Sequence, residues 1–398
     1  MAEICSNFHS NELVCEADSP PAEEDTDSFD HLSLAKALNV RARIEVVVRV
    51  FLQSLMESEP SIPSMSLICR NAKNTLLRAR GGCLSESPSI FLSHATFERS
   101  FTSDKGLKGY LRVWKVLELC YQLLGLGKRA TLREIYYILV SDRSSLFHVQ
   151  RQVNAAIQDV VALLHCSRHS LGILASSRGA LVGRLLIQEP DGEVINCTTL
   201  KSHARVISGD ITYLEKLKYK SDARYILVVE KEAIFQRLSE DRFFMMVPSI
   251  IITGKGYPDL ATRVVLHSLH KHFPSLPIMA LVDWNPAGLA IICTYKFGSM
   301  IMGLESPRYV CDVKWLGLRS KDIPLIPHES QLDLKGRDKT IAKGLLASKM
   351  LENQPKHREE LHKMLNCGKR IEIEALYAHG YAFLGKIISQ KIVQHDYI

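Results

Sequence analysis

The fold of this chain is decided by one stretch of sequence, IMALVDWNPAG at residues 278–288. An uninterrupted apolar run ends in Asp283, and Pro286 then opens a helical segment. Apolar runs of this length indicate a strand that is buried on both faces of a parallel sheet. The stretch therefore predicts a strand, an acidic residue at its carboxyl end and a helix, which is the repeating unit of a doubly wound α/β domain.

The same unit recurs on both sides of this stretch. We predict parallel strands at Tyr225–Val229, Ser249–Thr253, Ile278–Val282 and Tyr309–Trp315. The helical segments between them lie at Lys231–Leu238, Leu260–His272 and Gly288–Phe297. A mostly helical segment from Thr340 to Ile398 completes a mixed α/β domain that we place at residues 222–398.

A second domain, with a different pattern, is predicted at residues 106–205. Amphipathic helices are expected at Leu111–Leu124 and Val149–His165, and a capping box of Thr131 and Glu134 starts a shorter helix between them. Two β-like runs then flank the turn Ser177-Arg178-Gly179. Helices followed by a hairpin suggest a winged helix-turn-helix, whose tip residue Arg178 would lie near DNA phosphates. Such units also serve as plain contacts between proteins, so that alternative stays open.

The N-terminal part is expected to be less regular. Residues 1–34 are acidic, rich in Ser and Pro and without periodicity, which is typical of a disordered tail. Residues 35–105 are predicted to hold one helix, from Ala35 to about Met56, followed by a loosely structured connector.

The composition favours a polyanionic partner. The chain of 398 residues has 50 Lys and Arg against 43 Asp and Glu, and nine of those acids lie in residues 1–30, which contain no Lys or Arg. The remainder is therefore strongly basic, as suits a protein that binds nucleic acid. No cysteine pair has CxxC spacing, which argues against zinc, and no apolar run is long enough to span a bilayer. The first residues do not resemble a secretory signal, so we expect an intracellular protein that does not contact a membrane.

Two adjacent tyrosines occupy different faces of the predicted short helix. At 100° per residue, Leu132, Ile135, Tyr136 and Leu139 form one apolar stripe, and Tyr137 lies outside it. Arg133, four residues earlier, shares the face of Tyr137. A cation there could stabilise a phenolate or hold a phosphate under attack. The ordinary alternative is an exposed tyrosine resting on an arginine.

Two carboxylates end strands of the predicted sheet. Glu230 follows YILVV and Asp283 follows IMALV, so both lie at the carboxyl edge, where α/β domains place their chemistry. Two converging carboxylates suit a hard cation, and Mg²⁺ fits best. The alternative is that each acid caps the helix after it. Between them, Gly254 and Gly256 would let the backbone and Lys255 approach DNA, and no phosphate-binding P-loop is present.

These motifs together resemble a known family. The order R-E-x-x-Y, V-E-K-x-A, K-G-Y-P-D and V-D-x-N-P-x-G is similar to that of the A subunit of topoisomerase VI and, more closely, of its eukaryotic relatives, the sporulation-eleven family. The segments DVVALLHCSRHSLGILASSRG, GKGYPDLATR and LVDWNPAGLAI look most like the plant second-paralogue branch. The resemblance covers about residues 35–398.

The resemblance implies a winged-helix catalytic domain followed by a Toprim domain. It implies that Tyr137 is the nucleophile of a transesterification that makes meiotic double-strand breaks with a 5′-phosphotyrosyl link, and that Arg133 supports it. Glu230 and Asp283 would bind Mg²⁺; relatives usually have a second acid where this chain has Asn285, whose amide oxygen could serve instead. Independently of the resemblance, we expect Arg178, Lys255 and Tyr257 to contact DNA.

The resemblance also implies partners. In the family, the tyrosine of one protomer works with the Toprim acids of another, so we expect a homodimer, or a heterodimer with a paralogous A-type subunit, on double-stranded DNA in the nucleus. An ATPase subunit of the GHKL type would gate dimerisation. Two alternatives stay open: a non-catalytic DNA-binding partner of an active paralogue, which Asn285 favours, and a somatic counterpart of the topoisomerase VI A subunit.

Overall fold

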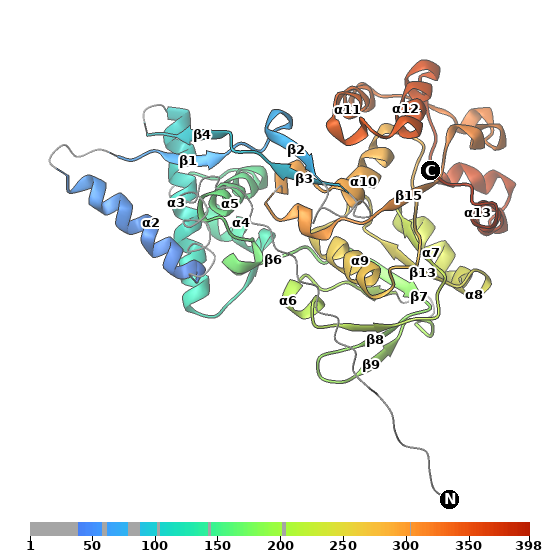
Figure 1. Ribbon diagram of the computed structural model, residues 1–398, viewed down its shortest axis with the longest axis horizontal. Coiled ribbons are helices and arrows are strands. Elements are labelled where there is room, and N and C mark those ends of the chain that lie inside the picture. Colours follow the sequence, from blue (N-terminus) through green and yellow to red (C-terminus); the bar gives the residue numbers. More distant parts are fainter. Residues whose placement is uncertain are drawn as a thin grey trace, which may run out of the picture. The chain divides into compact units, whose positions relative to one another are not determined.

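The computed structural model describes residues 39–57, 62–78, 88–101, 104–141, 145–200, 204–302 and 304–398. The residues from Val40 onward form one structural unit with two hydrophobic cores, one among helices α2 to α5 and one around a six-stranded sheet (Figure 1). The predicted acidic tail at residues 1–34 lies outside the described residues. Within them, no helix combines the length and the apolar character needed to cross a membrane.

The first core is built by helices whose apolar stripes were predicted. The helices are α2 (Val40–Leu55), α3 (Asp104–Gly125), α4 (Leu132–Ser141) and α5 (Gln150–Leu164). Helix α5 is central, since Val153, Ile157 and Val160 are fully buried against α3 and α4. A short parallel pair of strands, β5 (Ala130–Thr131) and β6 (Ile173–Leu174), closes the core beside α4.

The predicted loose connector is wrong for the described part of residues 57–105. It contains two antiparallel pairs, β1 (Met65–Ile68) with β4 (Thr96–Arg99) and β2 (Thr75–Arg78) with β3 (Ser89–Leu92). Polar side chains hold the loops between them: the Asn74 amide donates to the Cys69, Ser93 and Ala95 carbonyls at 2.8–3.1 Å. Such short strands carry too few residues for a readable alternation.

The second core contains the predicted parallel sheet. The strands of the sheet lie in the order β10-β7-β13-β12-β14-β15. The last four strands in this order are parallel to one another. The parallel strands are β12 (Tyr225–Val229), β13 (Ser249–Thr253), β14 (Ile278–Leu281) and β15 (Val313–Gly317). The helices after them are α7 (Glu232–Glu240), α8 (Phe243–Met246), α9 (Leu260–His272) and α10 (Pro286–Phe297). The last strand begins later than predicted, because Ser306–Tyr309 forms a 3₁₀ turn.

The predicted hairpin around Arg178 is wrong. β6 pairs with β5, whereas β7 (Ala180–Gly183) joins the six-stranded sheet, antiparallel to β13 and to β10 (Arg205–Val206). All four residues of β7 are buried, which requires a sheet with both faces covered. The domain limit at residue 205 stays a prediction, and this pairing favours a boundary before Ala180.

The connection between β6 and β7 passes close to helix α9. A Cβ atom on Gly179 would lie 2.1 Å from the Thr262 Oγ1, so only glycine allows the chain to approach this closely. Beyond β7, a three-stranded antiparallel sheet and a short helix continue the chain. These elements are β8 (Leu186–Gln188), β9 (Val194–Asn196), α6 (Ile211–Leu214) and β11 (Lys218–Lys220).

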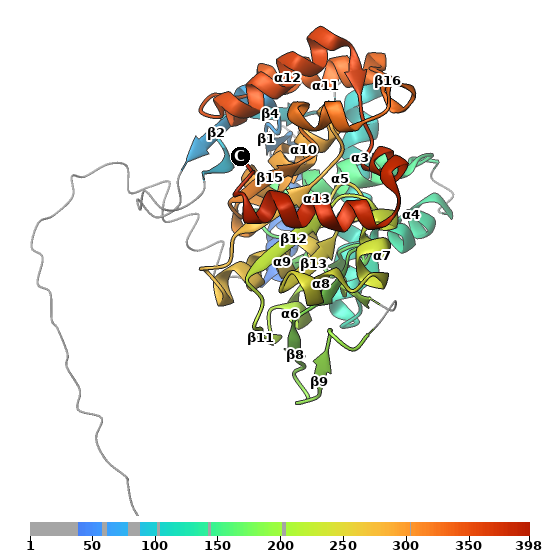
Figure 2. The same ribbon diagram turned by 90° about the vertical axis from the view of Figure 1, so that its right-hand side faces the viewer.

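The C-terminal segment is mostly helical, as predicted. Figure 2 shows its helices α11 (Gly336–Leu346), α12 (Pro355–Cys367) and α13 (Ala382–Val393) at the red end of the chain. Two short strands, β16 (Leu332–Asp333) and β17 (Lys369–Arg370), pair with each other. Directly after β17, Ile371 exchanges two backbone hydrogen bonds with Trp284, at 2.9 and 3.1 Å. This pair ties the segment to the carboxyl end of β14.

Candidate functional site: an exposed tyrosine and a buried acidic cluster

Helix α4 begins with the predicted capping box. The Thr131 N–H donates to the Glu134 carboxylate at 2.6 Å, and the Glu134 N–H donates to the Thr131 hydroxyl at 3.2 Å. These bonds satisfy two groups that a helix start leaves without a helical partner, and they fix the first turn of the helix. The bonds to Thr131 also hold the pKa of Glu134 below its usual value.

The two tyrosines of α4 face different surroundings, as the helical wheel predicted. Tyr136 is half-buried against the first core and donates a long hydrogen bond, 3.4 Å, to the His148 carbonyl. Tyr137 is 57% exposed, and its ring lies 5.3 Å from that of Tyr136. Arg133 is exposed as well. Within the described residues neither Tyr137 nor Arg133 forms a hydrogen bond or an ion pair, so both side chains can meet a ligand without first breaking a polar contact.

The two predicted carboxylates converge at the carboxyl edge of the sheet. β12 and β14 are neighbours, and the Asp283 N–H donates to the Glu230 carboxylate at 2.9 Å. The Asp283 side chain accepts a hydrogen bond in turn, since its Oδ1 accepts from the Ile373 N–H at 2.9 Å. Neither acid caps the helix that follows it, so the capping alternative does not hold for Glu230 and Asp283.

Burial makes this pair of carboxylates hard to ionise. Burial and the neighbouring Asp283 charge raise the pKa of Glu230 to about 7. Burial likewise raises the pKa of Asp283 to about 6, although Lys231 opposes the shift. A divalent cation between them would relieve the repulsion, so the site is electrostatically suited to bind one.

Asn285, and not Asp283, caps the helix that follows β14. It is the N-cap of α10, and its amide oxygen accepts from the Gly288 N–H at 2.7 Å. Its amide nitrogen lies 3.5 Å from the Asp283 Oδ2. The oxygen that was predicted to bind metal is therefore already engaged, and its role as a ligand stays a prediction.

The other members of this cluster were not predicted from the sequence. The Lys231 ammonium lies 3.3 Å from Asp283, 3.2 Å from Glu372 and 2.5 Å from Glu374. Burial disfavours its charge, but Asp283 and Glu374 raise the pKa of Lys231 above its ordinary value. The motif V-E-K-x-A contains Lys231, whereas Glu372 and Glu374 follow β17, far along the chain, and no local pattern points to them.

The predicted DNA-contacting residues gather beside the acidic cluster. The loop from Gly254 to Asp259 follows β13, and its Gly256 N–H donates to the Glu230 carbonyl at 2.8 Å. Lys255 pairs with Glu232 at 2.7 Å, and Tyr257 is 44% exposed. Burial, helped by the charge of Glu230, raises the pKa of Tyr257.

Arg178 reaches the same loop, although it does not lie at a hairpin tip. Its N–H donates to the Asp259 carboxylate at 3.0 Å, and its guanidinium donates to the Tyr257 carbonyl at 3.4 Å. The fold thus brings Arg178, Lys255 and Tyr257 to one surface. Their contact with DNA stays a prediction.

The donor set suits a hydrated magnesium ion. The described residues contain no group of three or more His, Cys, Asp or Glu arranged to hold a metal. Two carboxylates nevertheless fit Mg²⁺, which keeps several waters and takes one or two carboxylates from a protein. Glu230 and Asp283 are therefore the residues that would hold it.

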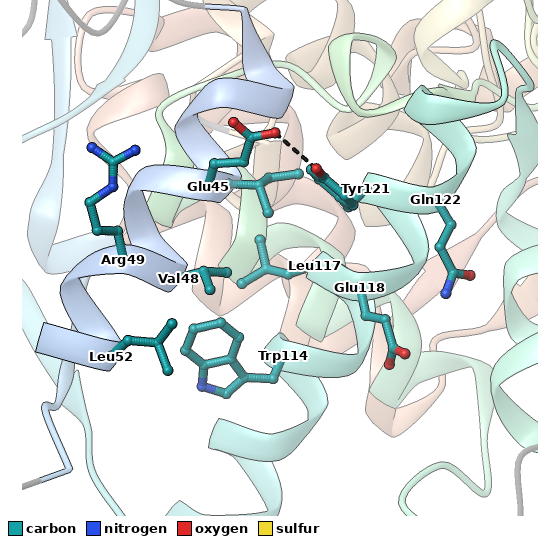
Figure 3. Close-up of a pocket in the computed structure, with 10 residues that line it drawn as sticks. Glu45, Val48, Arg49, Leu52, Trp114, Leu117, Glu118, Tyr121 and Gln122 are labelled. Atoms are coloured by element: carbon teal, nitrogen blue, oxygen red, sulfur yellow. Dashed lines mark hydrogen bonds between the residues drawn. The ribbon is translucent and has the colours of Figure 1, made fainter. Parts of the chain in front are cut away.

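Two hollows lie in or beside the first core. One, of 580 Å³, separates α2 from α3 and is lined mainly by apolar side chains such as Val48, Leu52 and Trp114 (Figure 3). At its edge the Tyr121 hydroxyl donates to Glu45 at 2.8 Å. The other, of 490 Å³, is lined in part by apolar residues such as Leu132, the first residue of α4. Its remaining lining residues are polar ones that the sequence did not single out: Arg70, Arg151, Asn154, Gln158 and Arg168.

Comparison with known proteins identifies the family of the chain. Residues 108–173 match the family described as type IIB DNA topoisomerase, and residues 225–392 match the Toprim domain common to Spo11 and the A subunit of topoisomerase 6. The chain is 54% identical to the rice (japonica) meiotic recombination protein SPO11-2 over 395 residues, which cover 99% of this chain and 98% of that protein. The Arabidopsis thaliana protein of the same name is 52% identical over 374 residues, or 93% and 97% of the two chains. The A subunit of Arabidopsis DNA topoisomerase 6 is 32% identical over 364 residues, or 90% and 82%.

Proposed function

Since this chain belongs to the family formed by Spo11 and the A subunit of topoisomerase 6, we propose that it breaks double-stranded DNA in meiosis and stays linked to the broken end through Tyr137. One observation carries the assignment of the nucleophile. Of the two adjacent tyrosines on α4, Tyr137 is exposed beside the exposed Arg133, and Tyr136 is held against the core. The high identity to meiotic recombination proteins supports the meiotic role over a somatic one.

The reaction is a transesterification. The Tyr137 hydroxyl loses its proton and its oxygen forms a bond to phosphorus, while the bond from phosphorus to the 3′ oxygen breaks. The 3′ oxygen leaves and takes up a proton, and the 5′ end remains on the tyrosine. One phosphodiester replaces another, so breakage needs no ATP. Arg133 holds the phosphate oxygens on which charge develops.

The supporting parts come from both cores. Helices α3, α4 and α5 with the β5–β6 pair form the winged-helix domain that presents Tyr137 to the duplex. Glu230 and Asp283 hold Mg²⁺, which when bound supplies positive charge beside the phosphate oxygens. Arg178, Lys255 and Tyr257 contact the DNA backbone near the acidic cluster. Arg151, which lines the 490 Å³ hollow beside α4, offers a further cation for a phosphate.

The active site is assembled from two chains. Tyr137 lies on α4, which packs in the first core, and the acids end strands of the sheet in the second core. Within the described residues Tyr137 forms no hydrogen bond or ion pair with them. We therefore place Tyr137 of one protomer against Glu230 and Asp283 of another, in a homodimer or in a heterodimer with a paralogous A-type subunit. Symmetry then puts one such site on each DNA strand. A GHKL-type ATPase subunit supplies the nucleotide-driven step, and the complex works in the nucleus.

The decisive experiment is to map the DNA-linked residue. Covalent protein–DNA adducts are recovered under denaturing conditions from cells that make meiotic breaks, trimmed with nuclease and analysed by mass spectrometry. We expect a nucleotide remnant on the peptide that contains Tyr137. A remnant on another residue of this chain would overturn the assignment of the nucleophile.

The helix-capping role of Asn285 favours a second candidate function. Asn285 stands where relatives usually have a second acid, and its oxygen already accepts from the Gly288 N–H. The site therefore has one carboxylate fewer, which suits a non-catalytic DNA-binding partner of an active paralogue. The same adducts separate the two functions. If they contain only the tyrosine of a paralogue while this chain is present and bound to DNA, the second candidate replaces the first.

A further inference from the structure

One side chain contacts three of the four acids around the candidate metal site, Asp283, Glu372 and Glu374. The Lys231 ammonium lies within 3.3 Å of three carboxylates, which come from the end of β14, from Glu372 and from the 3₁₀ turn Ile373–His379. Its side chain is 23% exposed, and that of Asp283 only 6%. A cation thus already stands where the negative charge of the cluster is concentrated.

The backbone fixes this arrangement. The Trp284–Ile371 pair holds the C-terminal segment against the end of β14, and the Ile373 N–H occupies the Asp283 Oδ1. The Arg370 guanidinium forms a further ion pair with Glu372, at 3.2 Å. The Asp283 Oδ2 has only the long contact with the Asn285 amide nitrogen, 3.5 Å, besides the Lys231 ammonium at 3.3 Å, so it is the oxygen of this residue that faces a cation.

We propose that Lys231 is a positioning residue that serves as the internal counter-cation of the acidic cluster and is displaced from Asp283 when a divalent metal binds. This inference rests on the divalent-metal site of the proposed function. A metal ion held by Glu230 and Asp283 would bring a second positive charge beside the Lys231 ammonium, and the two cations would repel each other strongly.

The carboxylates of Glu372 and Glu374 can keep their ion pairs with the Lys231 ammonium after it leaves Asp283. Glu374 is its nearest partner, at 2.5 Å, and Glu372 lies at 3.2 Å. A small movement away from Asp283 keeps both of these ion pairs. The two glutamates thus serve to hold the lysine, and Lys231 lowers the metal affinity of the site while keeping the metal-free cluster assembled.

The test compares Mn²⁺ binding to the full-length chain and to Lys231→Met by isothermal titration at fixed ionic strength. Only the binding that Glu230→Gln abolishes in the wild-type chain is counted. We expect Lys231→Met to bind Mn²⁺ about tenfold more tightly. Its metal-free melting temperature should be lower, and saturating Mn²⁺ should raise that temperature by more than in wild type. Equal or weaker binding by Lys231→Met overturns the proposal.

Two further variants control for charge and for folding. Lys369→Met removes one lysine charge from the C-terminal segment. Among the described residues Lys369 forms an ion pair only with the exposed Asp333, at 2.7 Å. This variant should therefore bind Mn²⁺ as wild type does. Lys231→Arg keeps the charge, so its affinity should stay within about twofold of wild type. If Lys231→Met does not fold, Lys231→Gln takes its place with the same expected gain.

The outcome also separates this inference from the proposed metal site. If Mn²⁺ binding is unaffected by both Glu230→Gln and Asp283→Asn, the metal site itself is wrong. If those substitutions abolish binding and Lys231→Met leaves it unchanged, the metal site stands and the role of Lys231 falls.

Discussion

The tyrosine helix and the acidic cluster are built in opposite ways. Tyr137 and Arg133 are exposed, and a capping box and an apolar stripe on the other side of α4 hold them in place. Asp283 is buried, Glu230 and Lys231 are partly buried, and short polar contacts join each of them to Asp283. A nucleophile that must reach a phosphate in a duplex needs exposure on a rigid support, whereas a cation site needs charges assembled before the ligand arrives. The same substitution strategy should therefore give different results in the two regions.

The largest effect is expected at the exposed tyrosine. Tyr137→Phe removes the attacking oxygen without disturbing the core, so covalent adducts should fall by about 10³-fold or more, while the free energy of unfolding stays within about 0.5 kcal/mol of wild type. Tyr136→Phe is the matched control. It loses only the long bond to the His148 carbonyl and should keep adduct formation within a few-fold of wild type. Undiminished adducts in Tyr137→Phe would end the assignment.

A smaller effect on catalysis is expected from the acids, together with an effect on stability of the opposite sign. Glu230→Gln and Asp283→Asn each remove a carboxylate that would hold the metal, so adduct formation should fall by about 10²-fold and DNA binding should lose its dependence on magnesium. Both variants should be at least as stable as wild type without metal, because a buried repulsion is removed. Magnesium dependence that survives in both variants would contradict the site.

The acidic cluster should also make the stability of the protein depend on pH. The folded pKa of Glu230, about 7, lies above its ordinary 4.5, so the folded state binds the extra proton between these values. The free energy of unfolding contributed by Glu230 should therefore be greatest below about pH 4.5 and decline as the pH rises to about 7. The raised pKa of Asp283 acts in the same direction up to about pH 6. Denaturant titrations of metal-free protein should show this decline, and Glu230→Gln should reduce it; an unchanged profile in that variant would show that Glu230 is not the group responsible.

The sequence predicted the structural features that nearby residues determine, and it missed those that depend on residues far apart in the chain. β12, β13 and α9 were predicted to the residue, because a buried parallel strand is a continuous apolar run and Asp259 caps the helix locally. β7 looked equally strand-like but was assigned to a hairpin, because an apolar run does not say which sheet it joins. The strands between residues 65 and 99 were missed, because side chains such as Asn74 and the buried Asp159, which binds Arg70 and Arg99, organise them.

The candidate site shows the same division. Tyr137 was separated from Tyr136 by helix periodicity alone, and Glu230 and Asp283 were brought together by the rule that strand ends of a parallel sheet meet. Lys231 meets Glu374 across 143 positions of the sequence, and that contact follows from the Trp284–Ile371 pair, which leaves no periodic signal. Features set within one helix or by adjacent strands were thus accessible, and those set by the path of the C-terminal segment were not.

The smallest effect should come from the start of the tyrosine helix. Thr131→Ala removes the hydroxyl that accepts from the Glu134 N–H, so the free energy of unfolding should fall by about 1 kcal/mol in denaturant titrations. Glu134→Gln, which keeps a side-chain oxygen for the Thr131 N–H, should cost less. If α4 only needs to hold Tyr137 outward, Thr131→Ala should lower adduct formation no more than its loss of stability explains, and Mn²⁺ binding at Glu230 should not change. A loss of metal binding in Thr131→Ala would show that the two regions are coupled within one chain, and the separation between them would have to be given up.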